Sequence, residues 1–103
     1  MLLCMPKRTP SAHTAEIAGW FATWLRRRRE QNGWTQEQLA HRAGLSRNQV
    51  QNLENNRNNN QTGTGRVSAN PSLDTLLALE AAFDMRFGDL LVEVRTLMES
   101  EAR

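Results

Sequence analysis

Residues 35–55 read TQEQLAHRAGLSRNQVQNLEN, and this stretch decides the fold. Thr35 is a good N-cap for a helix, and Gln38 three residues later completes the Thr-x-x-Gln pattern of a capping box. Gly44 ends that helix, because glycine readily adopts the positive φ that a tight corner requires. Ser46 then caps a second helix, which occupies the rest of the stretch. The pattern therefore predicts a helix, a four-residue turn and another helix.

Apolar residues set the inward sides of these two helices. Leu39 and Ala40 lie on one side of the first helix, and Val50 and Leu53 lie on one side of the second. Leu45 falls in the turn, where its side chain can fill the angle between the helices. Both helices therefore pack inward and leave polar faces outside.

The outward face of the second helix is rich in amides and contains no lysine or glutamate. A merely solvated helix would be expected to carry charges at i,i+4 spacing. An arginine can instead grip guanine O6 and N7, and asparagine or glutamine can grip adenine N6 and N7. We therefore predict that this face reads DNA bases, with the following residues: Arg47, Asn48, Gln49, Gln51 and Asn52.

The chain before this stretch predicts a helix from about Thr14 that stops at Asn32-Gly33. Its apolar stripe of large side chains, among them Trp20 and Trp24, indicates core or a dimer surface. Residues 1–13 show no apolar period and are interpreted as a flexible basic arm. Lys7 and Arg8 in this arm either follow DNA phosphates or are simply disordered.

The chain after this stretch predicts a polar loop at 56–70 and two more helices. The loop either contacts DNA, for example through Arg66, or is a tolerated insertion. One helix opens at Pro71 and Ser72, and a last helix runs from about 87 to 101, longer than a monomer core needs. With no strand pattern anywhere, the fold class is all-α, in a single domain at 14–103.

Composition limits the functional classes. Residues 1–57 hold nine Lys/Arg and four Asp/Glu, whereas residues 58–103 hold four Arg and seven Asp/Glu. A basic front half suits a polyanion ligand, because neutralised phosphates release counterions. No apolar stretch approaches the roughly 20 residues that span a membrane, and one cysteine fits a reducing, cytoplasmic location. We expect no metal, because His13 and His41 lack partners at ligand spacing, no cofactor, and no enzymatic activity, because no nucleophile–base pair or acid–base dyad is evident.

Residues 33–55 strongly resemble the Cro/C1-type (XRE) helix-turn-helix family, and residues 71–79 resemble its fourth helix. The resemblance covers roughly residues 16–92. It implies a five-helix, lambda-repressor-like DNA-binding domain whose third helix enters the major groove. The long loop at 56–70 departs from the family, which usually joins these helices by a short one.

The resemblance also implies roles for residues around the two central helices. Gln36 resembles a glutamine that anchors to a phosphate and braces the third-helix residue beside it. Thr35 is interpreted mainly as a helix cap, and secondarily as a phosphate contact. Arg29 and Glu54 match a pair that bridges the first helix to the end of the third, whereas most of the arginines at 26–28 are expected on a solvated face. The predicted phosphate contacts are Thr35, Gln36, Ser46, Asn55, Asn56 and Arg57.

The function that the resemblance implies is a sequence-specific regulator of transcription. We expect a repressor that binds double-stranded DNA as a homodimer on a palindromic operator. The predicted dimer residues, in the last helix, are Phe87, Leu91, Val94, Leu97 and Met98. The alternative is an antitoxin that neutralises a toxin protein and represses its own promoter. A neighbouring toxin gene or a co-purifying partner would distinguish it.

Overall fold

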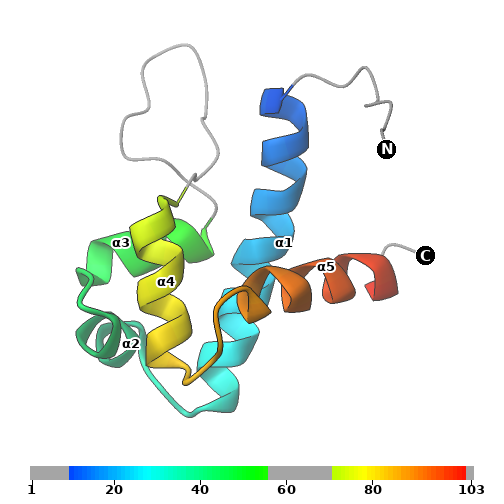
Figure 1. Cartoon of the computed structure of the whole chain (residues 1–103). Coiled ribbons are helices and arrows are strands. Elements are labelled where there is room, and N and C mark those ends of the chain that lie inside the picture. Colours follow the sequence, from blue (N-terminus) through cyan, green and yellow to red (C-terminus); the bar gives the residue numbers. More distant parts are fainter. Residues whose placement is uncertain (1–9, 56–70, 102–103) are drawn as a thin grey trace, which may run out of the picture.

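The computed structural model describes residues 10–55 and 71–101 of the chain and places five helices in them (Figure 1). No strand occurs in these two ranges. The five-helix, all-α prediction is confirmed. The helices are α1 (Pro10–Gln31), α2 (Gln36–Ala43), α3 (Arg47–Glu54), α4 (Leu73–Ala82) and α5 (Asp89–Glu101).

Capping boxes begin both α2 and α3. The Thr35 hydroxyl accepts from the Gln38 backbone N–H, and the Gln38 side chain accepts from the Thr35 N–H. Ser46 and Gln49 repeat this reciprocal pair at α3. Such pairs satisfy backbone donors that a helix start would otherwise leave without partners. The short helices therefore begin where the sequence predicts.

The turn between them depends on Gly44. Its φ of 71° is left-handed, and its N–H donates to the carbonyls of Ala40 and His41. Leu45 follows with an N–H bond to the Ala40 carbonyl, and its side chain packs partly buried against the core. A residue with a Cβ would be strained at this φ, so glycine fixes the angle between α2 and α3.

The core joins all five helices. Each helix contributes at least one side chain that is fully buried or nearly so, and α2 packs on both α3 and α4 while α1 packs on α3 and α5. Figure 1 shows α5 crossing α1 on one side of the molecule and α2, α3 and α4 gathered on the other. The largest fully buried side chains are Leu25, Leu39, Val50, Leu79, Leu90 and Val94.

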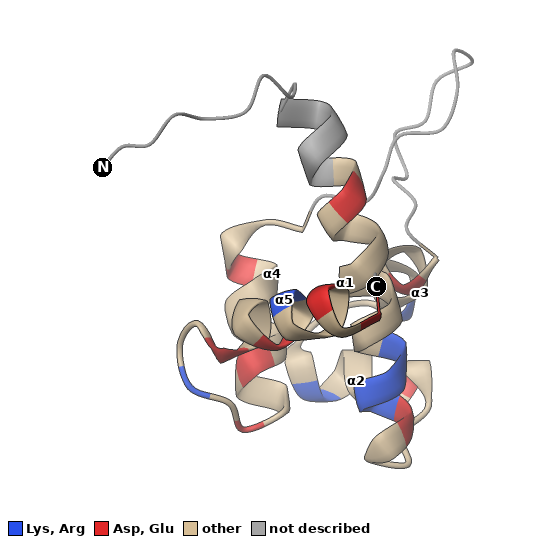
Figure 2. Cartoon of the chain, turned by 90° about the vertical axis from the view of Figure 1, so that its right-hand side faces the viewer, with Lys and Arg blue, Asp and Glu red and all other residues tan. Residues whose placement is uncertain are grey.

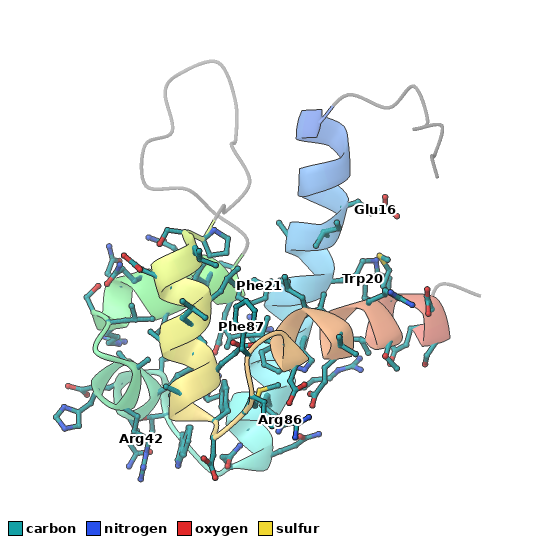
Figure 3. All side chains as sticks on the ribbon, viewed as in Figure 1. Glu16, Trp20, Phe21, Arg42, Arg86 and Phe87 are labelled. Carbon is teal, nitrogen blue, oxygen red and sulfur yellow. The ribbon has the colours of Figure 1, made fainter. Side chains whose placement is uncertain are left out.

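An aromatic cluster fills the space between α1 and α4. Trp24 stacks beside Phe21 and meets Phe83 edge-on, at centroid distances of 6.3 and 5.7 Å. Trp34, just before α2, stacks on Phe83 at 5.4 Å. Trp20 is only partly buried, on the part of α1 beside α5 (Figure 3). The aromatic stripe of α1 is therefore mainly core, one of its two predicted roles.

Two helices begin a few residues away from their approximate predicted starts. Helix α1 begins at Pro10, four residues before the expected Thr14. Proline is favoured at the first helical position, where its missing N–H costs nothing. Helix α5 begins at Asp89 rather than Phe87. Residues 1–9 and 56–70, which include most of the predicted arm and the predicted loop, lie outside the described residues.

A buried carboxylate holds the turn between α4 and α5. Glu80 is 5% exposed, and its Oε2 accepts from the N–H groups of Gly88 and Leu90 at 2.8 and 3.0 Å. Asp84 adopts a left-handed φ of 59° in the same turn. A side chain of α4 thus caps the start of α5 and fixes where the last helix begins.

Candidate nucleic-acid interface

Helix α3 buries one side and exposes the other. Val50 and Leu53 point into the core, and Glu54 is buried at the C-terminal end. The predicted base-reading residues occupy the remaining surface, where Asn52 is partly buried and the following are exposed: Arg47, Asn48, Gln49 and Gln51. The structure therefore brings the predicted reading residues together on one short helix.

These side chains differ in how far they are already engaged. Within the part of the chain that the structure describes, the side chains of Arg47, Asn48 and Gln51 make no hydrogen bond or ion pair. Gln49, in contrast, uses its carbonyl oxygen to accept from the Ser46 N–H at 2.8 Å. The guanidinium group of Arg47 and the amides of Asn48 and Gln51 thus remain available for a ligand. The Gln49 amide already makes one hydrogen bond within the protein.

A buried ion pair fixes the C-terminal end of α3 to α1. Arg29 donates from Nε and Nη2 to the two oxygens of Glu54 at 2.6 and 3.1 Å. The Glu54 side chain is fully buried, and Arg29 is 13% exposed. The hydrogen bond with Glu54 raises the pKa of Arg29. Arg29 also donates to the Trp34 carbonyl at 2.7 Å, so it also ties α1 to the start of the α2–α3 unit.

Gln36 joins this pair from the first turn of α2. Its Nε2 donates to Glu54 Oε1 at 3.0 Å. The resemblance had implied a brace to a neighbouring α3 residue, and the structure places that brace on Glu54 at the far end of α3. One N–H of the Gln36 amide remains for another acceptor. Gln36 therefore links the start of α2 to the same carboxylate that holds α3.

The four consecutive arginines at 26–29 are all paired with carboxylates. Besides Arg29, Arg26 lies 3.7 Å from Glu54, while Arg27 and Arg28 reach α5. The expectation of a largely solvated face was therefore incomplete: Arg26 and Arg27 are half exposed, yet each has an acidic partner. Helical spacing explains the division, because residues 26 and 29 are three apart and share the side of α1 that faces α3.

Apart from Gln36, the predicted phosphate residues fall into three groups. Thr35 and Ser46 are caps, and both are exposed at helix starts. Asn55 ends α3 and accepts from Arg26 Nη2 at 3.5 Å, a contact that sequence reasoning did not foresee. Asn56 and Arg57 lie outside the described residues. Thr35 and Ser46 therefore lie at the starts of α2 and α3, and Asn55 lies at the end of α3.

The predicted dimer residues do not share one surface. Phe87 is 83% exposed and Leu91 is 50% exposed, whereas Val94 is 2% exposed and belongs to the core. Leu97 and Met98 are partly buried, Leu97 against the core. Val94 is therefore wrong as an interface residue, because the chain's own helices already cover it. Sequence reasoning missed the other large apolar residues that are exposed within residues 10–55 and 71–101, which are Leu73, Leu77 and Val92.

The described residues hold no group of three histidine, cysteine or acidic side chains that could bind a metal ion. None of the described helices is both long enough and apolar enough to cross a membrane.

Comparison with known proteins identifies the α2–α3 pair as a helix-turn-helix. The helix-turn-helix family model matches residues 25–59. The solved structure of the wild-type restriction–modification controller protein C.Esp1396I is similar with a TM-score of 0.64, at 16% identity, over 82% of this chain and 96% of that protein. At this identity the likeness establishes the shared fold. A search of curated proteins gives no match.

The family match covers the end of α1 and both helices of the capped pair, which is the part of the molecule that carries the polar face. Residues 25–59 therefore form a helix-turn-helix of the kind that the family model describes, within a fold that the chain shares with the controller protein.

Proposed function

We propose that the chain is a cytoplasmic repressor that binds a palindromic operator as a homodimer. The observation that carries this proposal is the outward face of α3, which combines one guanidinium group with several amides on a helix anchored at its buried end. Rigid anchoring favours sequence reading, since base edges are distinguished only by side chains held in register. The proposed activity is binding, with no catalytic step.

In this proposal α3 lies in the major groove. Arg47 donates two hydrogen bonds to a guanine, and Asn48 and Asn52 each pair with an adenine edge. The start of α2 approaches the sugar–phosphate backbone, where its free N–H groups and the remaining Gln36 donor favour an anion. The α2–α3 unit thereby separates phosphate contacts, which set position, from base contacts, which set sequence.

The charge distribution supports DNA binding on the α2–α3 side. Residues 10–55 carry six arginines and four glutamates, whereas residues 71–101 carry seven acidic residues and two arginines. Figure 2 shows most of the acidic ribbon on α4, α5 and the turn between them. Because DNA repels that acidic part, the molecule's field favours approach with α3 toward the duplex.

Exposed apolar side chains support a homodimer. Phe87, Leu91 and Val92 are 83, 50 and 60% exposed at the start of α5, and Phe87 lies at the surface between α4 and α5 (Figure 3). Glu80 accepts a hydrogen bond from the Gly88 N–H in this turn, so the backbone next to Phe87 is already ordered before a partner binds. An isologous contact here pairs the same patch on both protomers.

A symmetric dimer explains repression by occlusion. Its two α3 helices enter successive major grooves about 34 Å apart, which requires an operator with twofold symmetry. A dimer on such a site blocks polymerase at an overlapping promoter.

The most direct test is selection of bound duplexes from a random pool. The proposal predicts an enriched inverted repeat whose half-sites lie about one helical turn apart. Enrichment of a single unrepeated half-site would contradict the homodimer, and no enrichment at moderate salt would contradict sequence reading.

The dimer surface is tested by Phe87→Ser, with Leu73→Ser as the matched control. Leu73 is also exposed, at 66%, but lies at the opposite end of α4. We expect Phe87→Ser to sediment as a monomer and to keep the unfolding midpoint of a dilute wild-type sample, because the side chain is barely buried within the protomer. If both variants dimerised equally well, Phe87 would not be part of the dimer interface.

A further inference from the structure

Arg26 on α1 makes the longest contacts of the four consecutive arginines. Its Nε lies 3.7 Å from Glu54 Oε1, which is beyond hydrogen-bond distance, and its Nη2 donates to the side-chain oxygen of Asn55 at 3.5 Å. The arginines at 27–29 each have a carboxylate oxygen at 2.6 to 2.9 Å. The Arg26 side chain is also 51% exposed. Most of its five N–H donors therefore have no strong acceptor within the described residues.

The carboxylate beside Arg26 is already neutralised by another arginine. Arg29 donates two hydrogen bonds to Glu54, and Gln36 donates a third. The Glu54 side chain is fully buried, so its charge is screened from a ligand by the groups that hold it. The cluster combines two guanidinium groups with one carboxylate, which leaves one positive charge in excess. That excess charge lies on Arg26, the exposed member.

Two amides next to Arg26 supply further hydrogen-bond donors. Gln36 Nε2 reaches the same Glu54 oxygen as Arg26, at 3.0 Å, and its second N–H has no acceptor among the described residues. Asn55 is exposed at the end of α3, and its Nδ2 group makes no hydrogen bond within residues 10–55 and 71–101. Helices α1 and α2 and the end of α3 thus bring donors to one place. Several donors around one excess positive charge suit an oxyanion.

We propose that Arg26 binds a phosphate of the DNA backbone beside the C-terminal end of α3, together with the amides of Gln36 and Asn55. The guanidinium fork matches two oxygens of one phosphate. This inference rests on the DNA binding in the proposed function and adds to it a contact from α1. Sequence analysis had assigned the arginines at 26–28 mainly to a solvated face.

The proposed orientation of α3 explains why a phosphate meets Arg26. With the outer face of α3 in the major groove, the start of α2 approaches the sugar–phosphate backbone. Gln36 lies in the first turn of α2, and Gln36 and Arg26 both lie next to Glu54 Oε1. A strand that passes the start of α2 therefore also passes Arg26. Glu54 thereby acts as a positioning residue, because it holds both donors beside the strand.

The decisive variant is Arg26→Gln, with Arg27→Gln as the matched control. Arg27 is the next residue of α1 and is 50% exposed, and it pairs with Glu101 of α5 instead of facing α3. Both substitutions remove one positive charge, so a general electrostatic effect on DNA binding is similar in both. Glu54 keeps its bonds to Arg29 in the first variant. Thermal unfolding checks that both variants remain folded.

Binding is first measured on the duplex selected from the random pool. We expect Arg26→Gln to bind about tenfold more weakly than Arg27→Gln, because it loses a charge-assisted hydrogen bond. The slope of log affinity against log salt should become shallower by about one for each Arg26–phosphate contact that is lost. Arg27→Gln should keep a slope close to that of the wild type.

The phosphate is then located by replacing each phosphate of the half-site in turn with an uncharged methylphosphonate. We expect one position, or two adjacent ones, where the replacement weakens the wild type and Arg27→Gln equally but weakens Arg26→Gln much less. Such a double-mutant cycle isolates the pairwise contact from the loss of charge. A general effect of charge would instead spread over all positions.

Two results would overturn the inference while leaving the proposed function intact. The first is equal affinity of Arg26→Gln and Arg27→Gln for the unmodified duplex. The second is a methylphosphonate scan in which Arg26→Gln and Arg27→Gln show the same losses at every position. Failure of the wild type to prefer any sequence would overturn the proposed sequence reading alone. The affinity and salt comparison would then be made on a scrambled duplex, because a phosphate contact does not depend on base sequence.

Discussion

Helices α2 and α3 are alike in construction and different in what they expose. Each has eight residues and begins with the same reciprocal capping box. The exposed surface of α2 includes Glu37, His41 and Arg42, and Arg42 lies over the Trp34 ring at 4.5 Å. The exposed surface of α3 instead carries one arginine and a set of amides.

The difference teaches that local helix signals do not assign the function of a helix. Capping and apolar spacing make both helices and pack both against the core. What separates α3 is the chemistry of its outer face, together with Glu54, whose buried carboxylate fixes its end to α1. A helix that reads bases needs a polar outer face and a fixed end. A supporting helix such as α2 needs neither of these features.

The largest effect is expected from breaking the anchor of α3. Replacing Glu54 with alanine leaves Arg29, only 13% exposed, without its carboxylate partner. Loss of one member of a buried pair costs about 3–5 kcal/mol. We expect the free energy of unfolding to fall by that amount in urea denaturation.

Glu37→Ala on α2 is the control for this change, because it removes an exposed glutamate. It should alter the free energy of unfolding by less than about 0.5 kcal/mol. If Glu54→Ala were no more destabilising than Glu37→Ala, the anchor would have no structural role. Glu54→Gln, which retains an acceptor for Arg29, is expected to fall between the two.

An intermediate effect is expected from the two caps. Ser46→Ala and Thr35→Ala each remove the side-chain acceptor of a capping box, and each should cost about 1 kcal/mol of stability. Ser46→Ala loosens the start of the helix that is proposed to read bases, so it should reduce the preference for the selected duplex over a scrambled one. Thr35→Ala lies at the proposed phosphate contact and should weaken binding to both duplexes alike. An equal loss of preference in the two variants would contradict the distinction between α2 and α3.

The smallest effect is expected where α1 meets α5. Arg27 and Glu101 form an exposed ion pair at 2.7 Å, unlike the buried pair that holds α3. The hydrogen bond from Arg27 lowers the pKa of Glu101 below its usual value. A carboxyl group whose pKa is lowered by folding stabilises the protein above its unfolded pKa, and that contribution is lost as the pH falls through the folded value.

The midpoint of thermal unfolding checks this sign. Wild type should melt slightly above Glu101→Gln at pH 7, and the two should converge as the pH is lowered past the folded pKa of Glu101. A difference that grew in acid would contradict the assigned pairing.

Local signals in the sequence predicted much of the α2–α3 unit. The Thr35–Gln38 box, the Gly44 corner and the inward Val50 follow from residue type and spacing alone. The pairing of Arg29 with Glu54 came from the family resemblance, since residues 25 positions apart give no local signal.

Tertiary contacts account for what the sequence did not predict. Helix α5 carries apolar residues on two sides, and spacing alone does not tell that Leu90 and Val94 face the core while Leu91 faces solvent. Glu80 was missed because its partners lie in the next turn, although a lone glutamate in an apolar run was a usable signal. Gln49 was interpreted only as a base reader because its capping role was not considered.

The central claim is that the outer face of α3 distinguishes base sequences. Titration of the double variant Arg47→Ala/Asn52→Ala with the selected duplex and with a scrambled one tests it most directly, beside Glu37→Ala/His41→Ala as the α2 control. Two lost base contacts should weaken specific binding by about thirtyfold or more, leaving weak, salt-sensitive binding that is equal for both duplexes, while the α2 control keeps its preference. Unchanged preference in the α3 double variant would contradict the account.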